Sequence, residues 1–125
     1  MGRSLLISGG LFCLVGVVPA WALEPGLYHG GGNRYIAIGR RGERLCYQGA
    51  SDRGITTASL TKVQTGYQVY GWDSQVLLIP QSTDRLRLGN TIYQRVQGSA
   101  IDPQGMLNCL LNPSNFSLQV DRLSK

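Results

Sequence analysis

The segment 29–32 has the sequence His-Gly-Gly-Gly, which invites a comparison with hydrolases. An HGGG loop supplies oxyanion-hole amides in some lipases and esterases, whose nucleophile lies in a G-x-S-x-G turn. The nearest serine turn, at 49–54, has its second glycine one residue too late, and His29 is the only histidine, so no imidazole remains as the base. The pattern therefore favours a flexible glycine bend. A small hydrolase built around Ser51, Asp52 and Arg53 is the weakest of the functional alternatives.

Metal and nucleotide chemistry is poorly represented among the residue types. One His and 3 Cys provide no set of three or four zinc ligands once two of the cysteines pair. The aspartates are scattered without a D-x-D-x-D-G calcium loop, and no G-x-x-x-x-G-K-[ST] phosphate loop occurs. We therefore expect no metal, no cofactor, no nucleic-acid partner and no enzymatic activity.

Arginine carries nearly all of the positive charge and is concentrated in one stretch. The chain has 12 Lys and Arg against 7 Asp and Glu, a net charge of +5. Guanidinium groups bind carboxylates and phosphates in a bidentate way. We expect the arginines at 40, 41 and 44 to project together from one hairpin tip as a docking site for an anionic partner, and a merely solvated turn is the alternative. The candidate arginines within residues 34–53 are Arg34, Arg40, Arg41, Arg44 and Arg53.

Aromatic residues suggest a second contact surface. Tyr and Trp suit half-exposed positions such as a barrel mouth or a recognition surface, although both also favour strands. The segment 70–73 has the sequence Tyr-Gly-Trp-Asp, a turn that should expose at least one large ring. Trp72 is therefore the first aromatic candidate for binding.

The segment 1–22 is typical of a secretory signal peptide. A basic start is followed by an apolar run over 5–18 and by Ala20-Trp21-Ala22, a small-x-small cleavage site. The run is shorter than the roughly 20 residues needed to cross a bilayer, so a retained anchor is the less favoured alternative. Residues 23–125 then form one domain in a periplasm or outside the cell.

Two cysteines, Cys46 and Cys109, remain after removal of that segment. In an oxidising compartment an even pair predicts a disulfide. Two free thiols are the alternative, but no CxxC motif or neighbouring His supports them.

Short strands account for most of the remaining sequence. The segment 35–38 is apolar on both faces, and 85–88 alternates between Arg and Leu. Gly-Asn at 89–90 is a two-residue hairpin signal, and Pro80 is expected to end the strand before it. Asp102 and Pro103 favour a short helix ending at Asn112, with a type I turn as the alternative. The predicted class is all-β, an antiparallel barrel or sandwich of seven to nine short strands, including 35–38, 44–48, 56–63, 67–70, 76–79, 85–88, 91–96 and 116–121.

Three short motifs carry a family resemblance. Tyr-Ile-Ala-Ile-Gly at 35–39, Leu-Cys-Tyr-Gln-Gly at 45–49, and Ser51 with Arg53-Gly54 resemble a family of small exported cyanobacterial proteins. The resemblance covers mainly residues 26–60 and transfers no catalytic or binding residue. It implies export, and it adds the thylakoid lumen to the periplasm as a compartment.

Together these patterns predict an exported, non-catalytic binding or accessory domain. Its partner is expected to be an anionic lipid, an acidic polysaccharide or a membrane protein complex. The partner is reached through the arginine-rich tip at 40–44 and through Trp72. The alternative is a small β-barrel carrier of an apolar ligand, which needs an empty interior.

Overall fold

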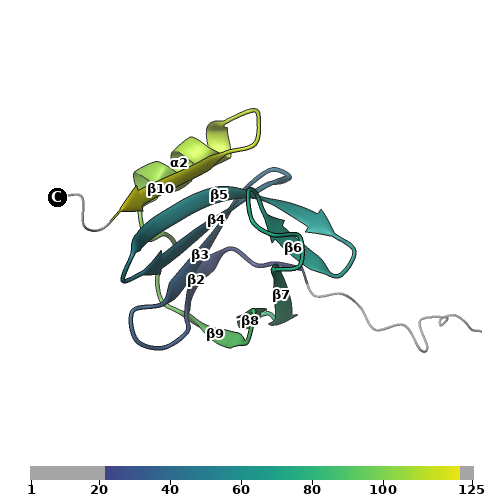
Figure 1. Cartoon of the computed structure of the whole chain (residues 1–125), viewed down its shortest axis with the longest axis vertical. Helices are drawn as coiled ribbons and strands as arrows, with labels where there is room; N and C mark the ends of the chain where they lie inside the picture. Colours follow the sequence, from purple (N-terminus) through teal and green to yellow (C-terminus); the bar gives the residue numbers. More distant parts are fainter. Residues whose placement is uncertain (1–21, 122–125) are drawn as a thin grey trace, which may run out of the picture.

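A computed structural model describes residues 22–121 and shows a barrel of antiparallel strands with one helix on its outside (Figure 1). The strands follow the order β10-β5-β4-β3-β2-β9-β8-β7-β6, and β5 also pairs with β6, which closes eight of the nine strands into a barrel. The predicted all-β class is confirmed, in its barrel form. Apart from Ala22, the predicted leader lies outside the described residues. The strands are β2 (Gly26–His29), β3 (Tyr35–Arg41), β4 (Arg44–Ser51), β5 (Gly54–Val63), β6 (Gly66–Val69), β7 (Leu77–Ser82), β8 (Arg85–Leu88), β9 (Thr91–Val96) and β10 (Ser117–Asp121).

Tight turns join neighbouring strands into a meander. Gly42 and Gly89 both adopt a left-handed backbone, with φ near +60°, which the two-residue hairpins at these positions require. Contrary to expectation, Pro80 does not end its strand, since β7 continues to Ser82. The register between β7 and β8 shifts between Pro80 and Ser82, and such an irregularity accommodates a residue that lacks an N–H.

The β3 and β4 strands are buried on both faces. Ile36 and Ile38 point into the barrel, whereas Ala37 points outward into a second cluster beneath the helix. This arrangement explains why the sequence of β3 is apolar on both faces. The barrel interior is filled by Leu23, Tyr28, Ile36, Ile38, Tyr47, Ala58, Leu60, Tyr67, Val69, Leu78, Leu86 and Tyr93.

The helix α2 (Pro103–Leu111) packs on the outer face of β3, β4 and β5. Pro103 occupies its first turn, and Met106 and Cys109 are buried against the sheet. The short helix is therefore confirmed, and so is the disulfide, because Cys46 of β4 is bonded to Cys109. No helix in residues 22–121 has the length and apolarity to cross a bilayer.

One edge of β5 is shared by two strands. Residues 54–58 pair with β10, and residues 60–63 pair with β6. The two partners part at Ser59, whose N–H donates to the Phe116 carbonyl at 2.9 Å and whose carbonyl accepts from the Tyr70 N–H at 2.9 Å. The barrel wall is therefore split at the end where β5 begins. We call this end, with turns 30–34, 52–53, 70–76 and 89–90, the mouth, and the end with turns 42–43, 64–65 and 83–84 the base.

Candidate functional site

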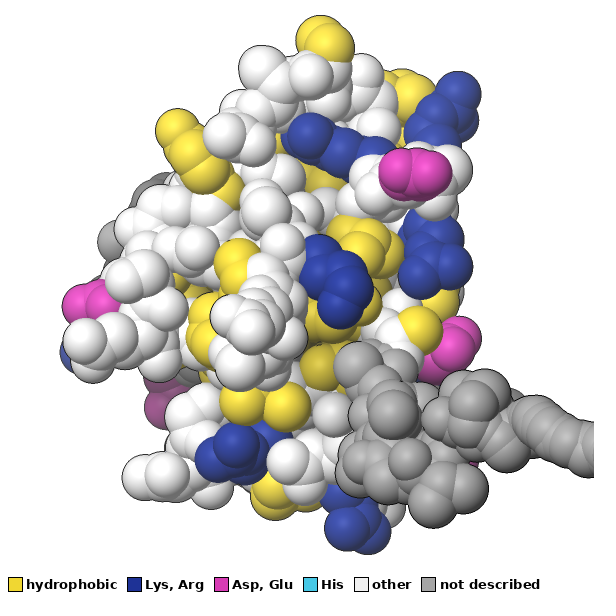
Figure 2. Space-filling view, turned by 90° about the vertical axis from the view of Figure 1, so that its right-hand side faces the viewer, with side chains coloured by type: hydrophobic (Ala, Val, Ile, Leu, Met, Phe, Trp, Pro, Cys, Tyr) yellow, Lys and Arg dark blue, Asp and Glu magenta, His cyan; other side chains and the backbone are white. Residues whose placement is uncertain are grey.

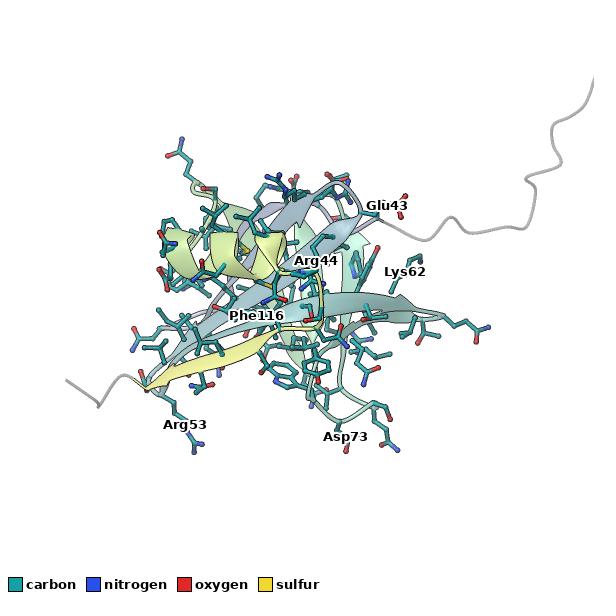
Figure 3. All side chains as sticks on the ribbon, turned by 90° about the horizontal axis from the view of Figure 1, so that it is seen from above. Glu43, Arg44, Arg53, Lys62, Asp73 and Phe116 are labelled. Atoms are coloured by element: carbon teal, nitrogen blue, oxygen red, sulfur yellow. A yellow bond between two sulfur atoms is a disulfide. The ribbon has the colours of Figure 1, made fainter. Side chains whose placement is uncertain are left out.

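The candidate arginines divide between the two ends of the barrel. Arg34 and Arg53 lie in turns of the mouth, whereas Arg40, Arg41 and Arg44 flank the turn at 42–43 in the base. Figure 3 shows Arg44 and Arg53 far apart on the molecule. The stretch that looks like one basic cluster in the sequence is therefore two separate groups in space.

Two of the three base arginines are bound to the protein's own backbone. Arg40 donates to the Leu23 carbonyl at 3.3 Å. Arg44 donates from Nε to the Cys109 carbonyl at 3.2 Å and from Nη2 to the carbonyl of Ser114, just after α2. A guanidinium is favoured there because the last carbonyls of a helix lack partners within it.

The three base arginines therefore do not project together from one tip as expected. Strand alternation turns Arg40 toward the inside of the barrel and Arg44 toward the helix. The Arg41 side chain is exposed, and its guanidinium makes no hydrogen bond to any residue that the structure describes. Figure 2, which views the side with the β5–β6 turn, shows basic side chains at separate places with acidic ones among them.

A cleft of about 240 Å³ opens at the mouth. Residues from several turns and strands meet there because alternate turns of an antiparallel meander lie at the same end. Three of the six residues predicted to bind a partner, Arg34, Arg53 and Trp72, are brought together at this cleft. Its main polar and aromatic walls are Arg34, Tyr47, Arg53, Trp72, Tyr93 and Gln119.

Trp72 forms a wall of the cleft instead of an exposed ring. The Trp72 N–H donates to the Val69 carbonyl at 3.0 Å, which closes a tight turn and folds the indole back over the barrel. The indole packs edge-on against Tyr47 with 5.2 Å between ring centroids. The large ring that this turn exposes is that of Tyr70, which is 45% exposed.

Two phenols, Tyr47 and Tyr93, were not singled out by the sequence as site residues. Glycines make room for both of them. A Cβ added at Gly49 would lie 2.1 Å from the Tyr47 oxygen, and one at Gly30 would lie 2.6 Å from the Tyr93 ring. The sequence signal for these two phenols is therefore indirect. It is a glycine, Gly49 or Gly30, at a position where any side chain would collide with the large ring that lies over it.

Both phenols remain neutral at physiological pH. Burial raises the pKa of Tyr47 far above its ordinary value, and the nearby Tyr93 adds to this effect. Burial also raises the pKa of Tyr93, with the positive charge of Arg34 opposing it. A neutral phenol keeps its O–H, so both groups are able to donate hydrogen bonds to a ligand.

The buried phenols predict a loss of stability in alkali. An unfolded tyrosine loses its proton near pH 10.0, whereas folded Tyr47 keeps it, so the free energy of unfolding falls as the pH rises above that value. Each phenol that stays protonated in the folded state lowers the free energy of unfolding by up to about 1.4 kcal/mol for each pH unit above that value. The free energy of unfolding, measured with urea at several pH values above 10, should fall less steeply with pH in Tyr47→Phe than in wild type. Tyr70→Phe is the control, and equal slopes for the two variants would contradict the prediction.

Among residues 22–121, neither mouth arginine forms an ion pair with an acidic side chain. The ion pair in this part of the chain joins Arg95 to Asp84 in the base, at 3.1 Å. Asp52 lies near the mouth arginines, but its carboxylate accepts a hydrogen bond from the Asn33 amide at 2.6 Å. Asp52 therefore borders the mouth together with Arg34 and Arg53 but forms no ion pair with either of them. Two guanidinium groups at one cleft that are not in ion pairs favour the binding of an anion.

The segment 29–32 closes on itself beside the cleft. The His29 ring stacks on Tyr35 with 4.5 Å between centroids, and its Nε2 donates to the Gly32 carbonyl at 3.0 Å. Ser51 Oγ accepts the Arg53 N–H at 3.2 Å within its own turn. His29 and Ser51, at the ends of β2 and β4, thus hold the turns that follow these strands.

The chemistry available at the mouth is recognition of an anion by two guanidinium groups, two neutral phenols and a flat apolar ring. Among the residues described, no three His, Cys, Asp or Glu side chains gather as metal ligands. Comparisons of the chain with protein-family models, curated proteins and solved structures gave no match. The function is therefore inferred from the geometry of the mouth.

Proposed function

We propose that this chain is an exported, non-catalytic binding domain that holds an anionic partner at its mouth. The observation that carries the proposal is the pair Arg34 and Arg53, which flank a cleft of about 240 Å³ and lack acidic partners among the described residues. The buried disulfide is compatible with an exported protein, because such bonds persist in oxidising compartments.

An acidic polysaccharide is the partner whose chemistry matches the walls best. A sugar carboxylate is planar and accepts two parallel hydrogen bonds from a guanidinium. The sugar hydroxyls find donors and acceptors in the Tyr93 phenol and the Gln119 amide, and the apolar face of the ring finds Trp72. Trp, Tyr and Arg are also the residues that most often dominate binding energies at interfaces.

A carrier of an apolar ligand is supported less well. Large side chains from all eight strands pack against one another inside the barrel, and the most buried of them, such as Ile36 and Leu78, are 0% exposed. A barrel of eight strands is either filled by side chains or holds one small ligand, and large side chains occupy this interior. The mouth is therefore a better place for a ligand than the interior.

The arginine pair can be tested with trigalacturonate as the probe. Amide shifts in a heteronuclear NMR titration should be confined to the mouth turns 30–34, 52–53 and 70–76. Arg34→Gln/Arg53→Gln should weaken binding about tenfold or more, because charge-assisted hydrogen bonds are lost. The neutral sugar maltotriose should not bind, and mass spectrometry should recover the trigalacturonate intact.

Arg41→Gln is the matched control, because it removes one exposed guanidinium from the base. Wild-type affinity in this variant and reduced affinity in the mouth variant support the mouth. The reverse result places binding at the base. Equal binding by all three proteins, or cleavage of the sugar, contradicts the proposal.

A further inference from the structure

The strand β10 is an edge strand with little protection against pairing. It is bonded to β5 on one side, and no other strand in residues 22–121 pairs with it. Natural edge strands are usually blunted by a proline, a bulge or a charged side chain. The residues of β10 are Ser, Leu, Gln, Val and Asp, so the only charge stands at its last position.

The register against β5 determines which backbone groups of β10 remain free. Phe116 accepts a hydrogen bond from Ser59, so the next hydrogen-bonded pairs along the ladder are Leu118 with Thr57 and Val120 with Ile55. The N–H and carbonyl groups of Ser117, Gln119 and Asp121 therefore point away from β5, toward the open edge.

The same strand exposes two large apolar side chains. Leu118 is 43% exposed and Val120 is 46% exposed, and both point to the outer face of the sheet. Val120 also borders an apolar cleft of about 330 Å³, together with Tyr35, Ala50 and Ile55. An open backbone edge beside exposed apolar residues is the arrangement that strand addition uses.

We propose that two copies of the chain pair through β10, antiparallel about a two-fold axis at Gln119. In this register each free backbone group of residues 117, 119 and 121 meets its counterpart on the second copy. Leu118 then stands opposite Val120 of the second copy in both non-hydrogen-bonded pairs, where side chains approach most closely.

The strand sequence favours a second copy over an unrelated peptide. Reversal of Ser-Leu-Gln-Val-Asp against itself matches apolar with apolar residues and Gln with Gln, and it pairs the single acidic residue with Ser117. No like charges face each other, and a two-fold pair is closed, so it ends at a dimer.

The pairing would place two mouths next to each other. Gln119 stands at the proposed axis and also lines the mouth cleft. A dimer therefore presents two anion sites to one polymer chain, and linked sites raise the overall affinity without new contacts. The pairing itself depends on β10 alone and does not require the proposed ligand.

Sedimentation velocity of the protein expressed from the full sequence, over a concentration series, tests the pairing. Wild type should be dimeric. Gln119→Pro removes the outward N–H but no bond to β5, and it should raise the dissociation constant about thirtyfold through loss of the two symmetric hydrogen bonds. Gln119→Ala is the matched control, because it loses the same side chain and keeps the N–H, so it should remain dimeric.

A second variant keeps the test decisive if the proline disturbs folding. Val120→Lys leaves the backbone intact and places a charge at the contact, so it should give a folded monomer. A monomeric wild type at every concentration, or a Val120→Lys dimer as tight as wild type, overturns the proposal.

Discussion

Replacement of both disulfide cysteines, as Cys46→Ala/Cys109→Ala, is expected to lower the free energy of unfolding by about 4 kcal/mol. The bond links positions 63 residues apart, so its loss frees a long loop in the unfolded chain. A small domain has a total stability of only about 5–15 kcal/mol. The variant should therefore be close to the limit of folding at physiological temperature.

Urea unfolding of the double variant and of wild type measures this effect. Both cysteines are 0% exposed, so wild type should resist reductant until the denaturant opens the fold. Amide hydrogen exchange in the variant should rise first in α2, because Cys109 is its covalent link to the sheet. Equal unfolding midpoints for the two proteins would show that the loop constraint contributes little.

The local structure of most elements is readable from the sequence, because each strand has a regular inward and outward side. Alternation at 85–88 and glycines at the turns predict β8 and its hairpin, and Asp102-Pro103 predicts the start of α2. The closure of the barrel is not local. It depends on β5 pairing with β6 and β10 along the same edge, and no segment of the sequence encodes this division by itself.

The site is predicted less well, because sequence neighbours on a strand are separated by its length. Arg34 and Arg41 are seven positions apart, and a strand advances about 3.3 Å per residue, so β3 carries them roughly 20 Å apart to opposite ends. Conversely, Arg34, Arg53 and Trp72 are distant in sequence but lie in three turns at the same end. Side-chain types therefore indicated the chemistry, and the topology selected which of them meet.

Gln48 shows how a buried polar residue fixes an element that apolar packing alone leaves loose. Its side chain is 0% exposed beneath the start of α2. Its oxygen accepts the N–H groups of Ile101 and Asp102, each at 3.1 Å. Its amide nitrogen donates to the Asp102 carbonyl at 2.8 Å and to Thr57 Oγ1 at 3.1 Å. One side chain thus uses all four of its hydrogen bonds to join β4, β5 and the turn before the helix.

Gln48→Leu is expected to lower the free energy of unfolding by about 4 kcal/mol. Leucine has a similar size, but it leaves the two half-buried N–H groups of Ile101 and Asp102 without partners, and each such group costs about 1–3 kcal/mol. The Asp102 carbonyl keeps the hydrogen bond that it accepts from the Met106 N–H. The matched control is Gln104→Leu, an exposed glutamine of α2, which should change the stability by no more than about 0.5 kcal/mol.

Urea unfolding of the two variants side by side decides the question. If Gln48 positions α2, its variant should also lose amide protection over 101–111 before the rest of the barrel opens, whereas the control should exchange like wild type. Equal stabilities would mean that water replaces the side chain. The Cys46–Cys109 disulfide and the hydrogen bonds of Arg44 would then be sufficient to hold the helix. The two attachments act at opposite ends of α2, Gln48 at the turn before it and Arg44 at its last carbonyls. Loss of either should therefore loosen a different end, and hydrogen exchange resolves which one.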